Sequence, residues 1–355
     1  GYAYLTILPV KLFGLTEFAT RFPGALFGSL TVLAFFIFTL TLFQNTKVAL
    51  LASFLLAIAP WHIILSRSSE QTLVALFFII TGFAFLFLGI RTKQQRYILL
   101  AGAIFVLSDF IYFVPRIFVP MFFFFLCITF FKTSSLYSKR FKTIFFSLFF
   151  CLCLLSLFLV FVVKGGSNRL NQASIFGFPE TKLIMEEQIR EDGTVGAPLI
   201  STRIFHNKII NYSLTFASNY IDYFSGNFLF IKGGLPIWFQ VPSMGLLYIV
   251  ELPFILFGTF ILLKQKKQFA RLLFIWLLLS PITAAVTADD IPNIRRSIAM
   301  FPALELLAAY GFISFLQNRT PRTKAIIVLA FSTLLLFNSS YFFHQYLINA
   351  KVHKT

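Results

Sequence analysis

GALFGSLTVLAFFIFTLTLF, at Gly24–Phe43, decides the fold class because it holds twenty residues without a charge. An α-helix of about 20 apolar residues crosses the roughly 30 Å hydrocarbon layer of a bilayer. The stretch ends in the short basic turn QNTK (Gln44–Lys47), and a second apolar stretch, Val48–Leu65, follows at once. These first stretches therefore predict a helical hairpin that crosses a membrane twice.

The same pattern continues along the 355 residues, which are 58% hydrophobic with a mean hydropathy of +0.84. Such a composition excludes an ordinary soluble domain. We predict ten spans, near residues 24–43, 48–65, 72–90, 97–113, 117–131, 144–163, 244–263, 272–288, 297–316 and 325–343. Pro115 and Pro120 interrupt one continuous apolar run, so the number of spans within residues 97–131 could differ by one. The predicted fold is an all-α polytopic membrane bundle with one long extracytoplasmic loop.

The charges assign the two faces of this bundle. Fifteen of the 30 Lys and Arg residues lie in five short turns that contain no Asp or Glu. These turns are Gln44–Lys47, Arg91–Arg96, Lys132–Thr143, Lys264–Arg271 and Gln317–Lys324. Basic turns of this kind mark the cytoplasmic side, so the acidic residues mark the outer side. Attraction to anionic lipid headgroups explains the net charge of +17 without invoking nucleic acid.

The spans divide the chain into five parts. We expect an extracytoplasmic lead-in at 1–23 that forms an interfacial helix, six spans at 24–163, an extracytoplasmic loop domain at 164–243, four spans at 244–343 and an external tail at 344–355. Both ends then lie outside, and we expect at least one further span upstream. Within the loop, one helical face collects Phe205, Ile209, Tyr212, Phe216 and Tyr220. This face favours a helix in the membrane interface over a surface helix of the loop domain.

Ionisable residues gather in three predicted outer turns, Trp61–Glu70, Asp109–Arg116 and Asp289–Arg296. Three outer turns of one bundle converge, so these groups are candidates to line a single outward-facing cavity. Each of these groups can also be explained by a purely structural role. Arg67 and Glu70 are three residues apart, as in an ordinary helix-end pair, and arginines or His62 next to a tryptophan are common at membrane interfaces.

Arginines are distributed over all three turns, at Arg67, Arg116, Arg295 and Arg296. Guanidinium groups bind phosphate oxygens through paired donors, so these four residues are candidates for binding a lipid-linked phosphate. Three carboxyl groups, of Asp109, Glu251 and Glu305, fall within apolar segments. Carboxylates are costly there and often mark a functional site, although a hydrogen-bonded structural role remains the alternative.

A family resemblance follows from several segments in the same order. Leu15–Gly28 (LTEFATRFPGALFG) is similar to the entry of the second span of bacterial GT-C glycosyltransferases, the protein-mannosyltransferase-like enzymes of glycosyltransferase family 39 and its relatives. Ala59–His62 with Ser66, Arg67 and Glu70 resembles their next outer turn. Two segments, Arg203–Lys208 and Asn219–Phe230, resemble the long outer loop of these enzymes. Two later segments, Arg295–Ser297 and Phe301–Pro302, resemble their late outer turn. The resemblance covers nearly the whole chain.

This resemblance implies a set of roles. Glu70, with Arg67 beside it, resembles the second acidic residue of the family. Arg295 or Arg296 resembles the arginine that binds the donor phosphate in the family. The main catalytic base belongs to a first outer loop that we expect upstream of Gly1. Candidate substrate-lining residues are His62, Asp109, Tyr112 and His206. We assign no metal ligands, because relatives differ in metal dependence and a divalent cation remains possible.

The function implied is transfer of a sugar from a polyprenyl-phosphate donor to a protein, lipid or glycan acceptor, with inversion at the sugar carbon. The predicted setting is a bacterial plasma membrane with the active site outside. Two alternatives remain. A transporter or flippase of a lipid-linked or anionic solute usually shows internal repeats, which we do not find in the sequence, and a non-catalytic lipid-binding membrane protein needs no catalytic acid.

Overall fold

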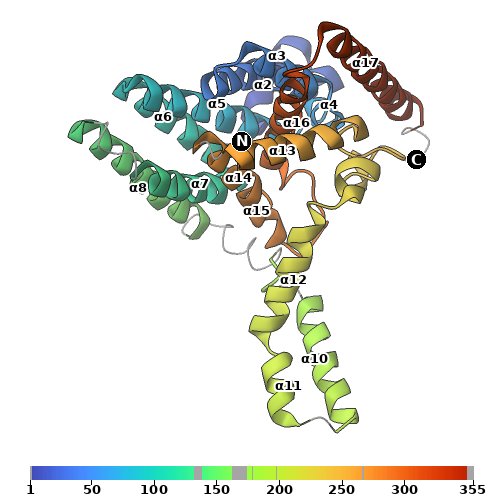
Figure 1. Ribbon diagram of the computed structural model, residues 1–355. Helices are drawn as coiled ribbons and strands as arrows, with labels where there is room; N and C mark the ends of the chain where they lie inside the picture. The colour runs from blue at the N-terminus through green and yellow to red at the C-terminus, as the bar shows by residue number, and fades with distance from the viewer. Residues whose placement is uncertain are drawn as a thin grey trace.

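The computed structural model describes residues 2–131, 138–161, 174–177, 179–196, 198–265 and 268–349. The described residues are 81% helical, and β-pairing between them is limited to isolated bridges. Figure 1 shows a bundle of helices from which an arm, formed by α10, α11 and α12, projects. The all-α expectation is therefore confirmed.

Helices occur at every predicted span. The first half of the bundle consists of α1 (Tyr2–Phe13), α2 (Glu17–Phe43), α3 (Thr46–Ile58), α4 (Pro60–Ser66), α5 (Gln71–Thr92), α6 (Gln95–Ile111), α7 (Val114–Phe131) and α8 (Lys139–Phe161). The arm consists of α10 (Pro179–Thr194), α11 (Leu199–Phe205) and α12 (Lys208–Asp222). The second half consists of α13 (Leu252–Gln265), α14 (Gln268–Leu279), α15 (Ile282–Ala285), α16 (Phe301–Leu316) and α17 (Pro321–His344). Short 3-10 or π-helical segments lie at 227–231, 237–239, 249–251, 298–300 and 345–349.

The predicted count of ten spans is not confirmed by helix length and composition among the described residues. Five helices within the described residues are long and apolar enough to cross a membrane: Glu17–Phe43, Gln71–Thr92, Lys139–Phe161, Ile298–Leu316 and Pro321–Asn349. Helices α3 and α4, bent by 58°, together form a possible sixth. The other predicted spans correspond to shorter helices, so a count of ten is not confirmed. Several parts of these predictions lie outside the described residues: 162–163 of the 144–163 span, 132–137 of the turn 132–143, 164–173 of the loop domain, residues 266–267, and 350–355 of the tail.

Two predicted boundaries differ from the structure. Helix α2 begins at Glu17 rather than near residue 24, because the Thr16 side chain caps it by accepting a bond from the Ala19 N–H. Helix α13 begins at Leu252 rather than near residue 244, and Pro253 fits its first turn, where a proline needs no N–H. Residues 244–248 instead form an irregular, buried segment, and a 3-10 turn at 249–251 leads into α13.

An aromatic cluster joins the two halves of the bundle. The Trp276 ring of α14 lies 5.4 Å from Phe38 of α2, 4.8 Å from Phe83 of α5 and 5.7 Å from Phe118 of α7, measured between ring centroids. Its indole N–H donates to the Ala299 carbonyl oxygen at 2.6 Å. Aromatic pairs at these separations add stability beyond the area that they bury, so Trp276 fixes α14 against the first half.

Helices α13 and α16 cross at van der Waals distance through two glycines. A Cβ atom at Gly311 would overlap with the carbonyl oxygen of Phe254, and one at Gly258 would overlap with that of Leu307. Small residues allow membrane helices to approach this closely and gain packing energy. The crossing holds the residues that precede α16 in place, and these residues contribute to the candidate site.

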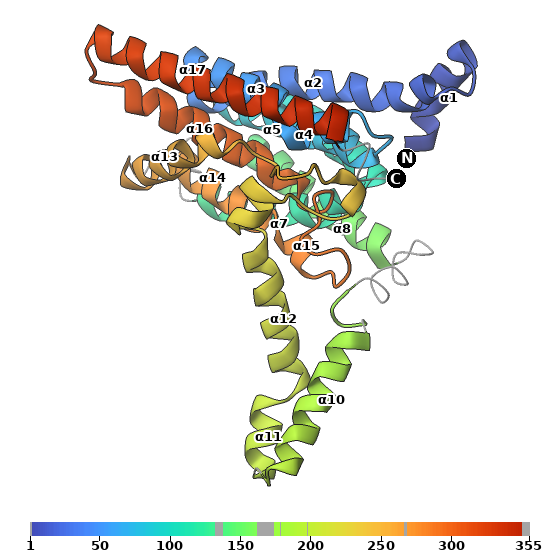
Figure 2. The same ribbon diagram turned by 90° about the vertical axis from the view of Figure 1, so that its right-hand side faces the viewer.

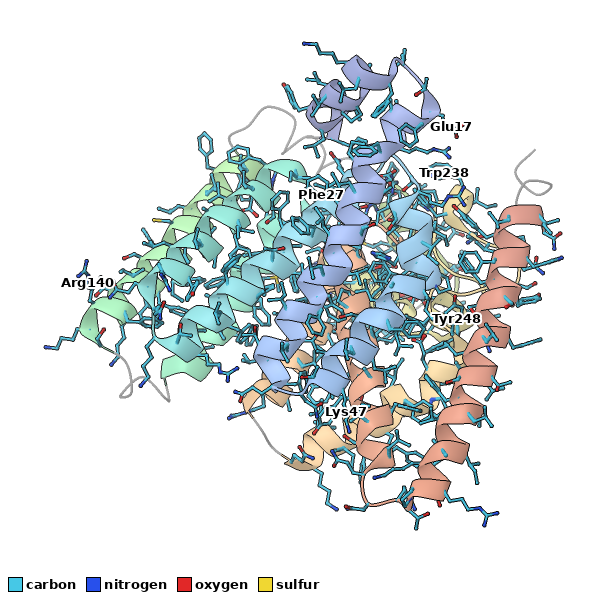
Figure 3. All side chains as sticks on the ribbon, turned by 90° about the horizontal axis from the view of Figure 1, so that it is seen from above. Glu17, Phe27, Lys47, Arg140, Trp238 and Tyr248 are labelled. Atoms are coloured by element: carbon cyan, nitrogen blue, oxygen red, sulfur yellow. The ribbon has the colours of Figure 1, made fainter. Side chains whose placement is uncertain are left out.

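Both ends of the described chain lie at the same end of the bundle (Figure 2). Near the N-terminus, the Tyr2 hydroxyl donates to the Thr20 carbonyl and accepts from the Gly24 N–H, each at 3.0 Å. Near the C-terminus, the Tyr346 ring lies 5.3 Å from the Arg67 guanidinium. Figure 3 places Glu17 at this end and Lys47, in the first basic turn, at the other.

The arm leaves the bundle across the direction of α2, α16 and α17 (Figure 2). Its predicted aromatic face is divided between two environments. Phe216 and Tyr220 are partly buried against the core, and the Tyr220 hydroxyl donates to the Leu278 carbonyl at 2.7 Å, whereas Phe205 and Ile209 are 61% and 79% exposed. Placement of the arm in a membrane interface remains a prediction.

Candidate functional site

Two of the three predicted outer turns meet in an ion pair. Helix α4 ends at Ser66, Glu70 directly precedes α5, and the Glu70 carboxylate accepts a hydrogen bond from Arg295 at 3.3 Å. The side chains are 23% and 27% exposed. Burial raises the pKa of Glu70 above its ordinary value, and the charge of Arg295 partly offsets this rise. The pair is therefore a polar contact at the end of the bundle that solvent still reaches.

The backbone before α16 holds two arginines in fixed positions. The Asn293 side-chain oxygen accepts hydrogen bonds from the N–H groups of Arg295 and Arg296, at 3.0 and 3.2 Å. The Asn293 N–H in turn donates to the Tyr223 hydroxyl at 3.0 Å. Burial raises the pKa of Tyr223 to about 12, so its hydroxyl stays neutral. This turn joins the base of the arm to the arginines.

Arg295 and Arg296 have different surroundings. The Arg295 guanidinium lies 5.7 Å from the centre of the Phe239 ring, besides its contact with Glu70. Arg296 donates two hydrogen bonds to the Asp289 carboxylate, at 2.8 and 2.9 Å, and others to Thr287 and to the Asp289 carbonyl. Arg296 thus closes the loop 287–296, and Arg295 is the more exposed of the two arginines.

Asp289→Asn should destabilise this loop. The Arg296 side chain is 12% exposed and that of Asp289 is 42% exposed, so losing this partly screened pair should cost about 1 kcal/mol of unfolding free energy. Arg296 lowers the pKa of Asp289. The stabilisation is therefore complete above the ordinary value of 3.8 and is lost as the pH falls through the lowered pKa. Thermal unfolding of both proteins across this acidic range measures the difference, with Asp290→Asn as the charge-matched control. Equal stabilities at neutral pH would contradict the assignment.

Of the site residues predicted in the outer turn Asp109–Arg116, one lies near the Glu70–Arg295 pair. Tyr112, after the end of α6, lies close enough to Glu70, Arg295 and Arg296 for their charges to act on its hydroxyl. Arg116 instead donates from Nε to the Asp109 carbonyl at 2.8 Å and from Nη1 to the Leu159 carbonyl at 3.4 Å. Asp109 is fully buried and accepts from the Ser156 hydroxyl at 3.2 Å. These contacts tie Arg116 and Asp109 to the ends of α6 and α8.

The other predicted site residues have separate surroundings. Arg67 is exposed beside Glu70 and lies over the Tyr346 ring. His62 is buried against Trp61, with ring centroids 5.3 Å apart. His206 lies in the arm, where its ring nitrogens are 3.1 Å from Gln188 and 3.4 Å from Asp192. The structure therefore does not bring His206 to the Glu70–Arg295 pair.

A buried carboxyl pair lies deeper in the bundle. Glu251, in the 3-10 segment before α13, and Glu305 of α16 are both fully buried and lie close to each other, and Glu305 accepts a hydrogen bond from the Trp61 indole N–H at 3.3 Å. Both carboxyl groups stood out in the sequence as acids within apolar segments. Asn293, Tyr223 and Phe239, which support the arginines, had no such signal. Among the described residues, no group of three or more His, Cys, Asp or Glu side chains is placed to hold a metal ion.

The long apolar helices define an integral membrane protein. No family model and no curated protein matches the sequence. Among solved structures, the chain is similar to the oligosaccharyltransferase AglB of Archaeoglobus fulgidus in complex with an inhibitory peptide and a dolichol-phosphate, at 14% identity and a TM-score of 0.53, over 96% of this chain and 46% of that one. The apo form of the A. fulgidus oligosaccharyltransferase gives 14% identity and a TM-score of 0.57, over 96% and 47%. ArnT from Cupriavidus metallidurans gives 12% and 0.50, over 93% and 51%.

Both proteins are glycosyltransferases of the GT-C superfamily, and the protein has the fold of that superfamily. The fold part of the sequence resemblance is thereby confirmed. The chain spans about half the length of these solved structures, and at such low identity the likeness concerns the fold alone.

Proposed function

We propose that this protein is a membrane glycosyltransferase that transfers a sugar from a polyprenyl-phosphate donor to an acceptor on the outer face of a bacterial plasma membrane. The observation that carries the proposal is the Glu70–Arg295 pair within a GT-C fold. Ser69, next to Glu70, donates to the Thr20 carbonyl near the start of α2, at the end opposite the turn that holds Lys47 (Figure 3). The similarity to a structure that contains a dolichol-phosphate supports a lipid-phosphate donor. The acceptor is a protein, lipid or glycan hydroxyl or amide.

In this reaction the acceptor atom forms a bond to the sugar C1 while the bond from C1 to the phosphate oxygen breaks, and the sugar configuration inverts. The electron pair of the broken bond stays on the departing polyprenyl phosphate. In this proposal Arg295 offsets the growing charge through paired N–H donors, and Arg67 lies beside the turn that holds Glu70. The acceptor proton passes to a carboxylate. By the family resemblance, that base belongs to the first outer loop, with Glu70 as the second acidic residue.

Membranes that contain the protein test the proposal when they are supplied with polyprenyl-phosphate sugars and candidate acceptors. We expect a sugar-modified acceptor and released polyprenyl phosphate in equal amounts, identified by mass spectrometry. Movement of the donor across the membrane without transfer would instead support a transporter. Donor binding with neither activity would support a non-catalytic lipid-binding protein.

Glu70→Gln should separate binding from turnover. The carboxylate occupies Arg295 and repels a phosphate, so the neutral amide should strengthen binding of polyprenyl phosphate about threefold to tenfold. Transfer should fall at least about tenfold, because the second acidic group is lost. Fluorescence-based lipid binding and the transfer assay measure the two effects. Glu17→Gln, which removes an exposed acid paired with Arg21, is the control. Weaker binding with unchanged transfer would contradict both roles of Glu70.

A further inference from the structure

A groove lies between α7 and α8, apart from the Glu70–Arg295 pair. Its cavity volume is about 440 Å³, and it is lined on α7 by Arg116, Pro120 and Met121 and on α8 by Cys153, Ser156 and Leu157. These residues recur at three- and four-residue steps, so the groove follows one face of each helix. A cavity of this size is in the range that binds small ligands.

Two of the residues that line this groove are polar. Arg116 bonds to the carbonyl oxygens of Asp109 and Leu159, near the ends of α6 and α8. Ser156 is 4% exposed and its hydroxyl is held by the buried Asp109 carboxylate, whose other oxygen has no hydrogen-bond partner. The groove is thus lined by one cation, Arg116, and one hydroxyl, Ser156, with Asp109 behind that hydroxyl, and the other lining residues are apolar or Cys153.

A second cavity serves as a comparison, because its lining carries no charged residue. It lies between α2 and α5, has a volume of about 230 Å³, and is lined by apolar side chains and Thr81. Nothing in that lining distinguishes one acyl chain from another. The α7–α8 groove differs from it by the charge of Arg116, which selects for an anionic headgroup.

The occupant is expected to come from the bilayer. Leu157 and Phe161, which also line the groove, are 54% and 64% exposed, so the groove opens on the outside of the bundle. Arg116 is a cation in the wall of this groove, and a guanidinium favours a phosphate group. We propose that the α7–α8 groove binds one anionic phospholipid, with its phosphate at Arg116 and one chain along Met121 and Leu157. This binding does not depend on the proposed glycosyl transfer.

Two cysteines allow a direct test. Cys153 lines the groove, whereas Cys151, two residues away, is exposed on the helix surface. Proteins that retain one of these thiols, with the other replaced by serine and Cys127 by alanine, are reconstituted in phosphatidylcholine vesicles with or without phosphatidylglycerol. Alkylation by N-ethylmaleimide is followed by mass. Phosphatidylglycerol should slow alkylation of Cys153 about fivefold, as expected for about 1 kcal/mol from one basic residue, and leave Cys151 unchanged.

Variants identify the cause of this protection. Arg116→Gln should abolish it, Arg116→Lys should retain most of it, and Arg140→Gln, at the start of α8 (Figure 3), should keep all of it despite the same loss of charge. Leu157→Trp, which fills the groove and leaves Arg116 intact, should prevent the effect of phosphatidylglycerol. Equal Cys153 rates in both vesicles would overturn the proposal, even if Arg116→Gln does not fold. Protection by polyprenyl phosphate but not by phosphatidylglycerol would overturn it by assigning the groove to the donor chain.

Discussion

Gly311→Leu is expected to leave little folded protein. The added side chain would occupy the position of the Phe254 carbonyl oxygen in α13, which is a backbone atom and cannot turn aside. Helices α13 and α16 would have to separate, which would also disturb the contact between Glu251 and Glu305. Overpacking of this kind costs about 3 kcal/mol or more. The fraction that remains monodisperse in mild detergent, and its thermal unfolding temperature, measure the loss.

Gly193→Leu is the matched control, because a Cβ atom at this helical glycine meets nothing within 4 Å. This change should leave the unfolding temperature of the bundle unaltered. A Gly311→Leu protein as stable as this control would show that α13 and α16 do not cross as described.

Arg295→Ala is expected to reduce sugar transfer by at least about 100-fold and to weaken polyprenyl-phosphate binding severely. The guanidinium is the more exposed of the two arginines before α16, and loss of a charged phosphate contact costs about 3 kcal/mol. Arg295→Lys keeps the charge but not the paired donors, so it should recover only part of the activity.

Arg319→Ala is the control for this experiment, because it removes one cation that lies over Phe315, in a basic turn. It should leave both binding and transfer unchanged. Full transfer by a correctly folded Arg295→Ala protein would show that this arginine does not hold the donor phosphate.

The helices could be predicted from the sequence because apolar length is a local property. A helix stands at each of the ten predicted spans, and the turn that contains Lys47 lies at the opposite end of α2 from Glu17 (Figure 3). The span count could not be predicted in the same way. It depends on where helices bend or stop, as at the junction of α3 and α4 and in the irregular segment before Leu252.

The partners of the ionisable residues were less predictable. Spacing in the sequence suggests that Glu70 pairs with Arg67, but its partner is Arg295, 225 residues away, and Arg67 lies over Tyr346 instead. The buried position of Glu305 could be expected from its apolar neighbours, whereas its contact with Glu251 depends on the α13–α16 crossing. Contacts between distant segments follow from packing, which one sequence does not display.

The direction of the arm affects how closely other proteins can approach the bundle. Helix α10 has 16 residues and is therefore about 24 Å long. The arm leaves the bundle across the direction of the long helices, so its far end stands clear of them (Figure 2). On that side the arm occupies the space through which another protein would approach the bundle, so the molecule has one obstructed flank.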